Sequence, residues 1–109
     1  MKQIISKLEL VEKTEVKGDG SSKEEKIVLS RIGEKDLYEI QHISDKGEAL
    51  SYLKEEFDLE KKQKENILLT RKEVTKIVAH FLKYIAEGQN NDSDIKKRYF
   101  LQIGVKDIE

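Results

Sequence analysis

Cysteine, proline and tryptophan are all absent from this chain of 109 residues. The lack of cysteine excludes disulfides, thiol nucleophiles and cysteine-ligated zinc. Long apolar runs are missing too, because none exceeds three residues, whereas a membrane-spanning helix needs about 20. The N-terminus does not resemble a signal peptide, since Lys7 interrupts the apolar stretch that a signal peptide requires. We therefore expect a small, soluble, cytoplasmic protein that does not enter membranes.

Charge of one sign is not in excess either. The chain has 21 Lys and Arg residues against 22 Asp and Glu residues, a formal net charge of −1. This balance gives no overall attraction to phosphate, so a preference for a charged partner must come from local clusters. Apolar residues make up 37% and charged residues 39%, which predicts a modest core with a charged rim. The length suits a single domain, residues 1–109.

The first part of the chain has the patterning of β-strands. Residues 4–16 alternate between apolar or β-compatible side chains and charged ones, which predicts a half-buried strand. Residues 18–22 are all turn-forming, and two further β-rich runs, 25–32 and 37–43, are separated by a second turn. Connections this short join antiparallel neighbours, so we expect a three-stranded antiparallel meander.

Helical periodicity replaces alternation after residue 44. Asp45 and Glu48 have the spacing of an N-cap and its capping-box partner, and apolar residues then recur at helical spacing as far as Phe57. Residues 60–66 contain no apolar side chain, so they are either a solvated extension of this helix or a connector.

A second helix is predicted over residues 70–88, with the clearest pattern of the chain. Thr70 and Glu73 form a T-x-x-E capping box, and Gly88 suits a left-handed C-cap. Its apolar positions follow helical spacing: Val74, Ile77, Val78, Phe81, Leu82 and Ile85.

The C-terminal segment, residues 94–105, fits two structures. Alternation across residues 99–105 predicts a strand that returns to the sheet, whereas a helix capped at Ser93 would place Ile95 and Tyr99 on one face. We favour the strand, and so predict an α+β fold: a three-stranded antiparallel meander followed by two packed helices and a C-terminal strand. Its expected core is Leu8, Leu10, Ile27, Leu29, Leu53, Phe57, Val78, Phe81 and Ile85.

Side chains suited to catalysis or metal binding do not cluster in the sequence. The two histidines have no second ligand at a metal-binding spacing; we expect His80 at the surface and His42 partly buried on the strand face of Ile40. Residues 18–23 contain G-x-G but lack the third glycine of a dinucleotide site, and no serine lies in a nucleophile motif. We expect no enzymatic activity, no cofactor and no metal site.

The most informative feature is a local asymmetry of charge. Residues 45–60 hold six acidic and two basic residues, whereas residues 61–84 hold seven basic and two acidic ones. On a helical projection Lys72, Lys76 and Lys83 lie opposite the apolar face and form a basic stripe. Such a helix, preceded by another helix and accompanied by a hairpin, has the parts of a winged helix, although here the strands come first.

Three lysines neutralise too few phosphates for tight binding, so useful affinity for DNA would require a homodimer or further basic residues. The additional candidates lie in the first hairpin and in the C-terminal segment: Lys17, Lys23, Lys26, Lys96, Lys97 and Arg98. The sequence thus favours a non-enzymatic binding module, most concretely a small regulatory or accessory protein that binds double-stranded DNA. The alternative is a protein-interaction adaptor that docks its partner on an exposed sheet edge or on the acidic helix.

Overall fold

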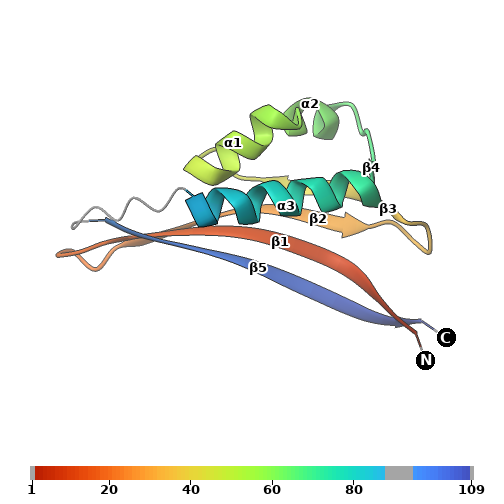
Figure 1. Cartoon of the computed structure of the whole chain (residues 1–109), viewed down its shortest axis with the longest axis horizontal. Helices are drawn as coiled ribbons and strands as arrows, with labels where there is room; N and C mark the ends of the chain where they lie inside the picture. Colours follow the sequence, from red (N-terminus) through yellow and green to blue (C-terminus); the bar gives the residue numbers. More distant parts are fainter. Residues whose placement is uncertain (1, 88–94, 109) are drawn as a thin grey trace.

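A computed structural model describes residues 2–87 and 95–108. Its elements, in chain order, are β1 (Lys2–Val16), β2 (Ser22–Arg31), β3 (Leu37–Ile43), α1 (Glu48–Glu56), α2 (Leu59–Lys64), β4 (Leu69–Thr70), α3 (Arg71–Glu87) and β5 (Ile95–Ile108). The strands form one five-stranded antiparallel sheet in the order β4-β3-β2-β1-β5, and the helices lie together on one of its faces (Figure 1). The predicted α+β fold, with its meander and its C-terminal strand, is confirmed.

The connection between the first two helices differs from the prediction. The described residues form three helices instead of two, because Asp58 takes a left-handed conformation (φ 49°, ψ 45°) that ends the helical path of α1. Residues 60–66 are polar, yet α2 is held on the core by the fully buried Leu59 just before them. The strand β4 was not predicted, since two residues are too few to show a pattern.

The C-terminal segment is a strand over all its described residues. β5 extends for 14 residues and pairs with nearly the whole of β1, so the alternative of a helix is wrong. Ser93 and Gly88, which were predicted to cap helices, lie outside the described residues.

The hydrophobic core lies between the sheet and the helices. Six of the nine residues predicted for it are buried there: Leu8, Leu10, Ile27, Leu29, Leu53 and Phe81. Phe57 and Ile85 pack against the core while partly exposed. Val78 is half-buried and does not join the core, because α3 turns Val74 and Ile77 toward the sheet instead.

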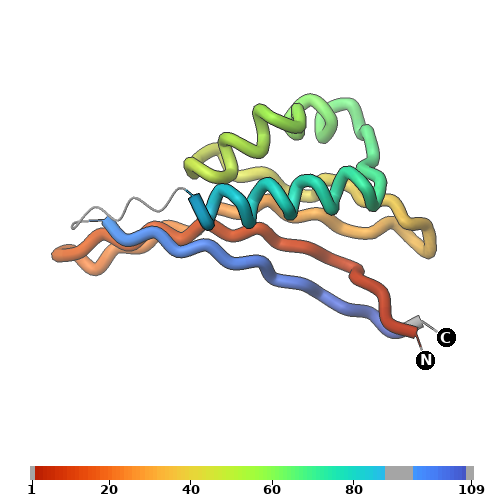
Figure 2. The backbone as a smooth tube through the Cα atoms, viewed as in Figure 1, coloured from red at the N-terminus to blue at the C-terminus, as the bar shows by residue number. Residues whose placement is uncertain are grey.

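One end of the β1–β5 pair separates from the rest of the sheet. The pairing of β1 with β2 ends at Lys7, whereas its pairing with β5 continues to Lys2. A β-bulge at Ser6 marks the point where the two-stranded ribbon begins, and Figure 2 shows this ribbon diverging toward the chain ends. Among the described residues no helix is long and apolar enough to cross a membrane.

Candidate functional site

The basic stripe of α3 is exposed as predicted. Lys72, Lys76 and Lys83 all point away from the core, and none of them takes part in an ion pair with a described residue. Three ammonium groups therefore lie along one solvent-facing line of the helix, and no carboxylate of the described residues neutralises them.

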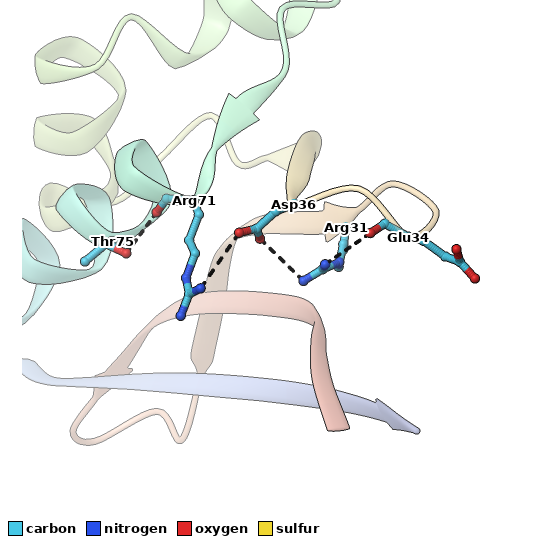
Figure 3. A network of polar contacts seen from close by, with 5 residues as sticks. All are labelled: Arg31, Glu34, Asp36, Arg71 and Thr75. Carbon is cyan, nitrogen blue, oxygen red and sulfur yellow. Dashed lines mark hydrogen bonds and ion pairs between the residues drawn. The ribbon is translucent and has the colours of Figure 1, made fainter. Parts of the chain in front are cut away.

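The N-terminal turn of α3 is fixed by its capping box and by a polar network. The backbone N–H of Glu73 donates to the Thr70 hydroxyl (3.2 Å), and the Glu73 carboxylate accepts from the backbone N–H of Thr70 (3.2 Å), as predicted. This backbone hydrogen bond lowers the pKa of the Glu73 carboxyl group below its ordinary value. Asp36, in the turn between β2 and β3, contacts Arg31 (3.4 Å) and Arg71 (3.9 Å), which anchors this end of α3 to the sheet (Figure 3).

The basic residues at the β1–β2 turn lie at the other end of β2, about 30 Å from the Asp36 turn at roughly 3.3 Å per residue. Lys17 and Lys96 line one shallow depression together with Glu15. Lys23 and Lys97 line another, in which they are mixed with acidic residues. Lys97 also forms an ion pair of 2.9 Å with Glu48.

Lys26 and Arg98 lie on the face of the sheet that the helices leave open. Paired residues of an antiparallel ladder share a face, and Lys26 pairs with Val11 while Arg98 pairs with Lys13, both of which point away from the helices. Lys26 is also paired with Glu24 at 3.2 Å. The nine predicted DNA-binding residues are therefore divided among α3, the turn end of the sheet and its open face, and two of them, Lys26 and Lys97, pair with carboxylates.

The N-terminus of α1 has an unexpected cap. Asp45 was predicted to cap this helix, but the N-cap residue is Gly47 and it makes no side-chain hydrogen bond, so the prediction is wrong. Instead, the Glu12 carboxylate, 1% exposed, accepts hydrogen bonds from the backbone N–H groups of Glu48 (2.7 Å) and Ala49 (2.8 Å). A helix N-terminus attracts anions, but this one is already occupied by a side chain of the same protein.

The two histidines lie in separate elements, His42 on β3 and His80 on α3. Within residues 2–87 and 95–108 no three His, Cys, Asp or Glu side chains lie where they could hold a metal ion. His80 lies half-buried, with its ring 5.0 Å from that of Phe57. His42 is exposed and does not share the face of Ile40 as predicted, because the register of β2 and β3 shifts between them and pairs His42 with Val28.

The two edges of the sheet differ sharply in how they are protected. At one edge β4 has two residues, and next to it the side-chain amide of Gln63 in α2 donates to the backbone carbonyl of Ile40 (3.4 Å) on β3. The other edge is β5, which is 14 residues long and pairs only with β1 among the described strands. Long open edges are unusual in monomeric proteins, since their free N–H and C=O groups invite pairing with another chain.

The backbone groups that β5 directs outward follow from the register. The backbone N–H of Lys26 donates to the Ser44 hydroxyl, and its carbonyl accepts from the backbone N–H of Ser44. Both groups of Lys26 therefore point toward β3, and those of its neighbour Ile27 point toward β1. By the same alternation, the backbone N–H and C=O groups of Val11 point toward β5, and those of its partner Phe100 point toward β1. The residues of β5 that direct their N–H and C=O groups away from β1 are therefore the odd-numbered ones in its uncharged centre: Tyr99, Leu101, Ile103 and Val105.

Exposed apolar side chains also concentrate on β5. Ile103 is 50% exposed and Val105 is 56% exposed, and Ile95 and Phe100 are exposed as well. From Tyr99 to Val105 the strand contains no charged residue. An uncharged, apolar segment with free backbone groups has the composition that favours addition of another strand.

Aromatic side chains of α3 pack against the face of β5 that points toward the helices. The Tyr99 ring lies edge-on to two rings of α3, with centroid separations of 6.2 Å from Phe81 and 6.4 Å from Tyr84. Burial, with the negative charge of Glu12 nearby, raises the pKa of Tyr99 to about 12. Tyr99 thus fixes the first half of β5 against α3.

No protein-family model matches this chain, no curated protein matches its sequence, and no solved structure matches its fold. The functional assignment therefore depends on the surfaces described above.

Proposed function

We propose that this chain is a non-enzymatic protein-binding module that accepts a strand of its partner along the outer edge of β5. The observation that carries the proposal is the contrast between the two sheet edges: Gln63 and a two-residue strand protect one, whereas at the other no described strand pairs with the outer side of the 14 residues of β5. In this mode of recognition the main chain provides most of the affinity, and alternate side chains provide specificity.

The added strand would bond to the outward backbone groups in the uncharged centre of β5. On the helix side of the sheet its side chains would lie next to Ile103 and Val105, which are about half exposed. Lys96, Lys97 and Arg98 precede this centre, so they limit how far an incoming strand extends and favour a partner with acidic residues at that end.

The test is recovery of a binding partner from the native host with a tagged chain and matched variants. Ile103→Lys places a charge on the edge without removing a buried side chain, and it should abolish capture of a stoichiometric partner. Ile67→Lys is the matched control, because Ile67 is also an exposed isoleucine (44%) but lies outside β5. Equal capture by wild type and Ile103→Lys would overturn the proposal.

A second candidate function, binding of duplex DNA, is favoured by one specific observation. Lys72, Lys76 and Lys83 lie along one exposed face of α3 and pair with no described carboxylate, whereas seven of the 14 Lys and Arg residues on the described strands, α1 and α2 do. Their three charges would give weak binding that is sensitive to salt, with log K falling by about 0.9 per log unit of salt for each phosphate contacted.

Charge reversal separates this candidate from the first. Lys72→Glu with Lys76→Glu should abolish DNA binding in fluorescence anisotropy and leave thermal stability and partner capture unchanged, since both side chains are exposed. Lys61→Glu with Lys64→Glu, on α2, is the matched control of equal charge change. DNA binding that survives the α3 reversal would reject the stripe as the DNA site.

A further inference from the structure

We infer that the strand added to β5 is the β5 strand of a second copy of this chain, paired antiparallel about Gln102. The inference rests on the proposed function and names the partner of the same edge. A two-fold axis through Gln102 and perpendicular to the sheet would join two copies of the five-stranded sheet into one continuous sheet, with the helices of both copies on the same face.

The two-stranded end of the β1–β5 pair gives a reason for the addition of a third strand. Residues 2–5 of β1 pair with β5 and with no other described strand, so this part of the sheet has two strands. A two-stranded ribbon is marginally stable by itself in water and gains from a third strand. Ile5 and Val105 form a cross-strand pair there, both exposed, on the face that the helices cover elsewhere. In the two-fold arrangement the first half of the second copy's β5 becomes the third strand of this ribbon.

The direction of the backbone groups restricts the register. The outward residues of β5 are odd-numbered, so two copies can share hydrogen bonds only if odd residues face odd residues. A centre at Gln102 meets this condition, and it places Leu101 opposite Ile103 and Tyr99 opposite Val105 on the helix side. The exposed apolar side chains of each copy then lie beside the partly buried Leu101 and Tyr99 of the other.

Charge and side-chain size favour a two-fold axis at Gln102 over one at Leu101. Centring on Gln102 places Lys97 opposite Asp107, an attractive pair, and Phe100 opposite Gly104, where an aromatic ring can cover a glycine backbone. It also places Arg98 opposite Lys106, but on the open face, where both side chains reach water.

Centring on Leu101 satisfies the same backbone condition with a poorer match. That register places Lys96 opposite Lys106 and Lys97 opposite Val105, and it provides no attractive pair of charges for Lys97. Of these two registers the one centred on Gln102 gives the better match, so we assign the axis to it.

The first measurement is the molar mass in solution by sedimentation equilibrium over a range of concentrations. The wild type and Ile67→Lys should approach twice the chain mass of 12.7 kDa. Ile103→Lys should remain monomeric, with its dissociation constant raised by about tenfold or more, since a buried isoleucine is lost from the interface. Circular dichroism on the same samples verifies that each variant is folded.

Single-cysteine cross-linking tests the register, and the chain is suited to it because it contains no native cysteine. In the proposed arrangement Gln102 faces itself in a non-hydrogen-bonded pair, with a Cα separation of about 4.5 Å that suits a disulfide. Gln102→Cys should therefore form a disulfide-linked dimer on mild oxidation. Phe100→Cys, on the same face of β5, should not, because its two copies would lie about 13 Å apart along the strand.

The outcomes separate this inference from the proposed function. A monomeric wild type at high concentration, or equal cross-linking of Phe100→Cys and Gln102→Cys, would overturn the inference. If the monomeric wild type still captures a different protein in a manner that Ile103→Lys abolishes, the inference fails while the proposed function stands. If capture is also insensitive to Ile103→Lys, both fail.

Discussion

The backbone N–H of Glu48, at the start of α1, donates a hydrogen bond of 2.7 Å to the carboxylate of Glu12 on β1. Ala49 donates a second one to the same carboxylate, so a buried side chain of the sheet takes the place of a local helix cap. Each of these donors would otherwise be an unsatisfied group at the helix end. This contact joins the first strand to the first helix across 36 positions of sequence.

Glu12→Gln should destabilise the protein, because the amide retains one acceptor oxygen and turns an N–H donor toward a backbone N–H. We expect a loss of about 1–3 kcal/mol in the free energy of unfolding, measured by urea denaturation. Glu24→Gln, an exposed glutamate on the adjacent strand, is the control and should change stability by about 0.5 kcal/mol or less. Equal effects of the two substitutions would contradict the capping role of Glu12.

Gly47→Ala should also be destabilising, for two separable reasons. Gly47 has φ 115°, where an L side chain is strained, and a Cβ there would lie 3.2 Å from Glu12 Oε2. In the background of Glu12→Ala the steric conflict disappears while the backbone strain stays, so Gly47→Ala should cost less there than in the wild type. A double-mutant cycle in urea measures this difference, and perfect additivity would argue against the contact.

The capping box of α3 should contribute to stability in a pH-dependent manner. Thr70→Ala should cost about 1 kcal/mol at neutral pH. The pKa of Glu73 is lowered in the folded state, so its contribution is present above the ordinary value of 4.5 and is lost as the pH falls through the lowered pKa. The stability difference between wild type and Glu73→Ala should therefore shrink between pH 7 and strongly acidic pH. A difference that grows on acidification would contradict this sign.

Tyr99 should make the protein sensitive to alkaline pH. Burial raises the pKa of Tyr99 to about 12 from an ordinary value of 10.0, so the stability it provides is complete below pH 10 and is lost as the pH rises toward 12. Tyr99→Phe should flatten the fall of stability over that range, measured by denaturation at successive pH values. Tyr52→Phe, which removes the hydroxyl of an exposed tyrosine, is the matched control.

Much of the fold could be predicted because the strands and helices carry their own periodicity. The three strands of the meander and the helix that begins at the Thr70 capping box are confirmed, and so is the C-terminal strand. These patterns are local, and a single buried face explains each of them.

The details that sequence patterns missed depend on contacts between distant residues. Glu12 is a buried charged residue on the helix-facing side of β1, and the reason appears only in the fold, where its carboxylate caps α1. A register shift between β2 and β3 exposes His42, and no local signal marks that shift. The open edge could not be predicted either, because the position of β5 beside β1 follows from the strand order. The one sequence signal of the open edge was the apolar centre of β5, and burial of this strand inside the sheet explains the same pattern equally well.

Residue-resolved amide hydrogen exchange shows whether a partner binds at the outer edge of β5. In the dilute free chain the outward amides of Leu101 and Ile103 should exchange much faster than the inward amides of Phe100 and Gln102. In the complex, formed with a second copy at high concentration or with a captured partner, Leu101 and Ile103 should become protected to a level similar to Gln102. A complex in which these two amides continue to exchange as fast as in the free chain would contradict strand addition at β5.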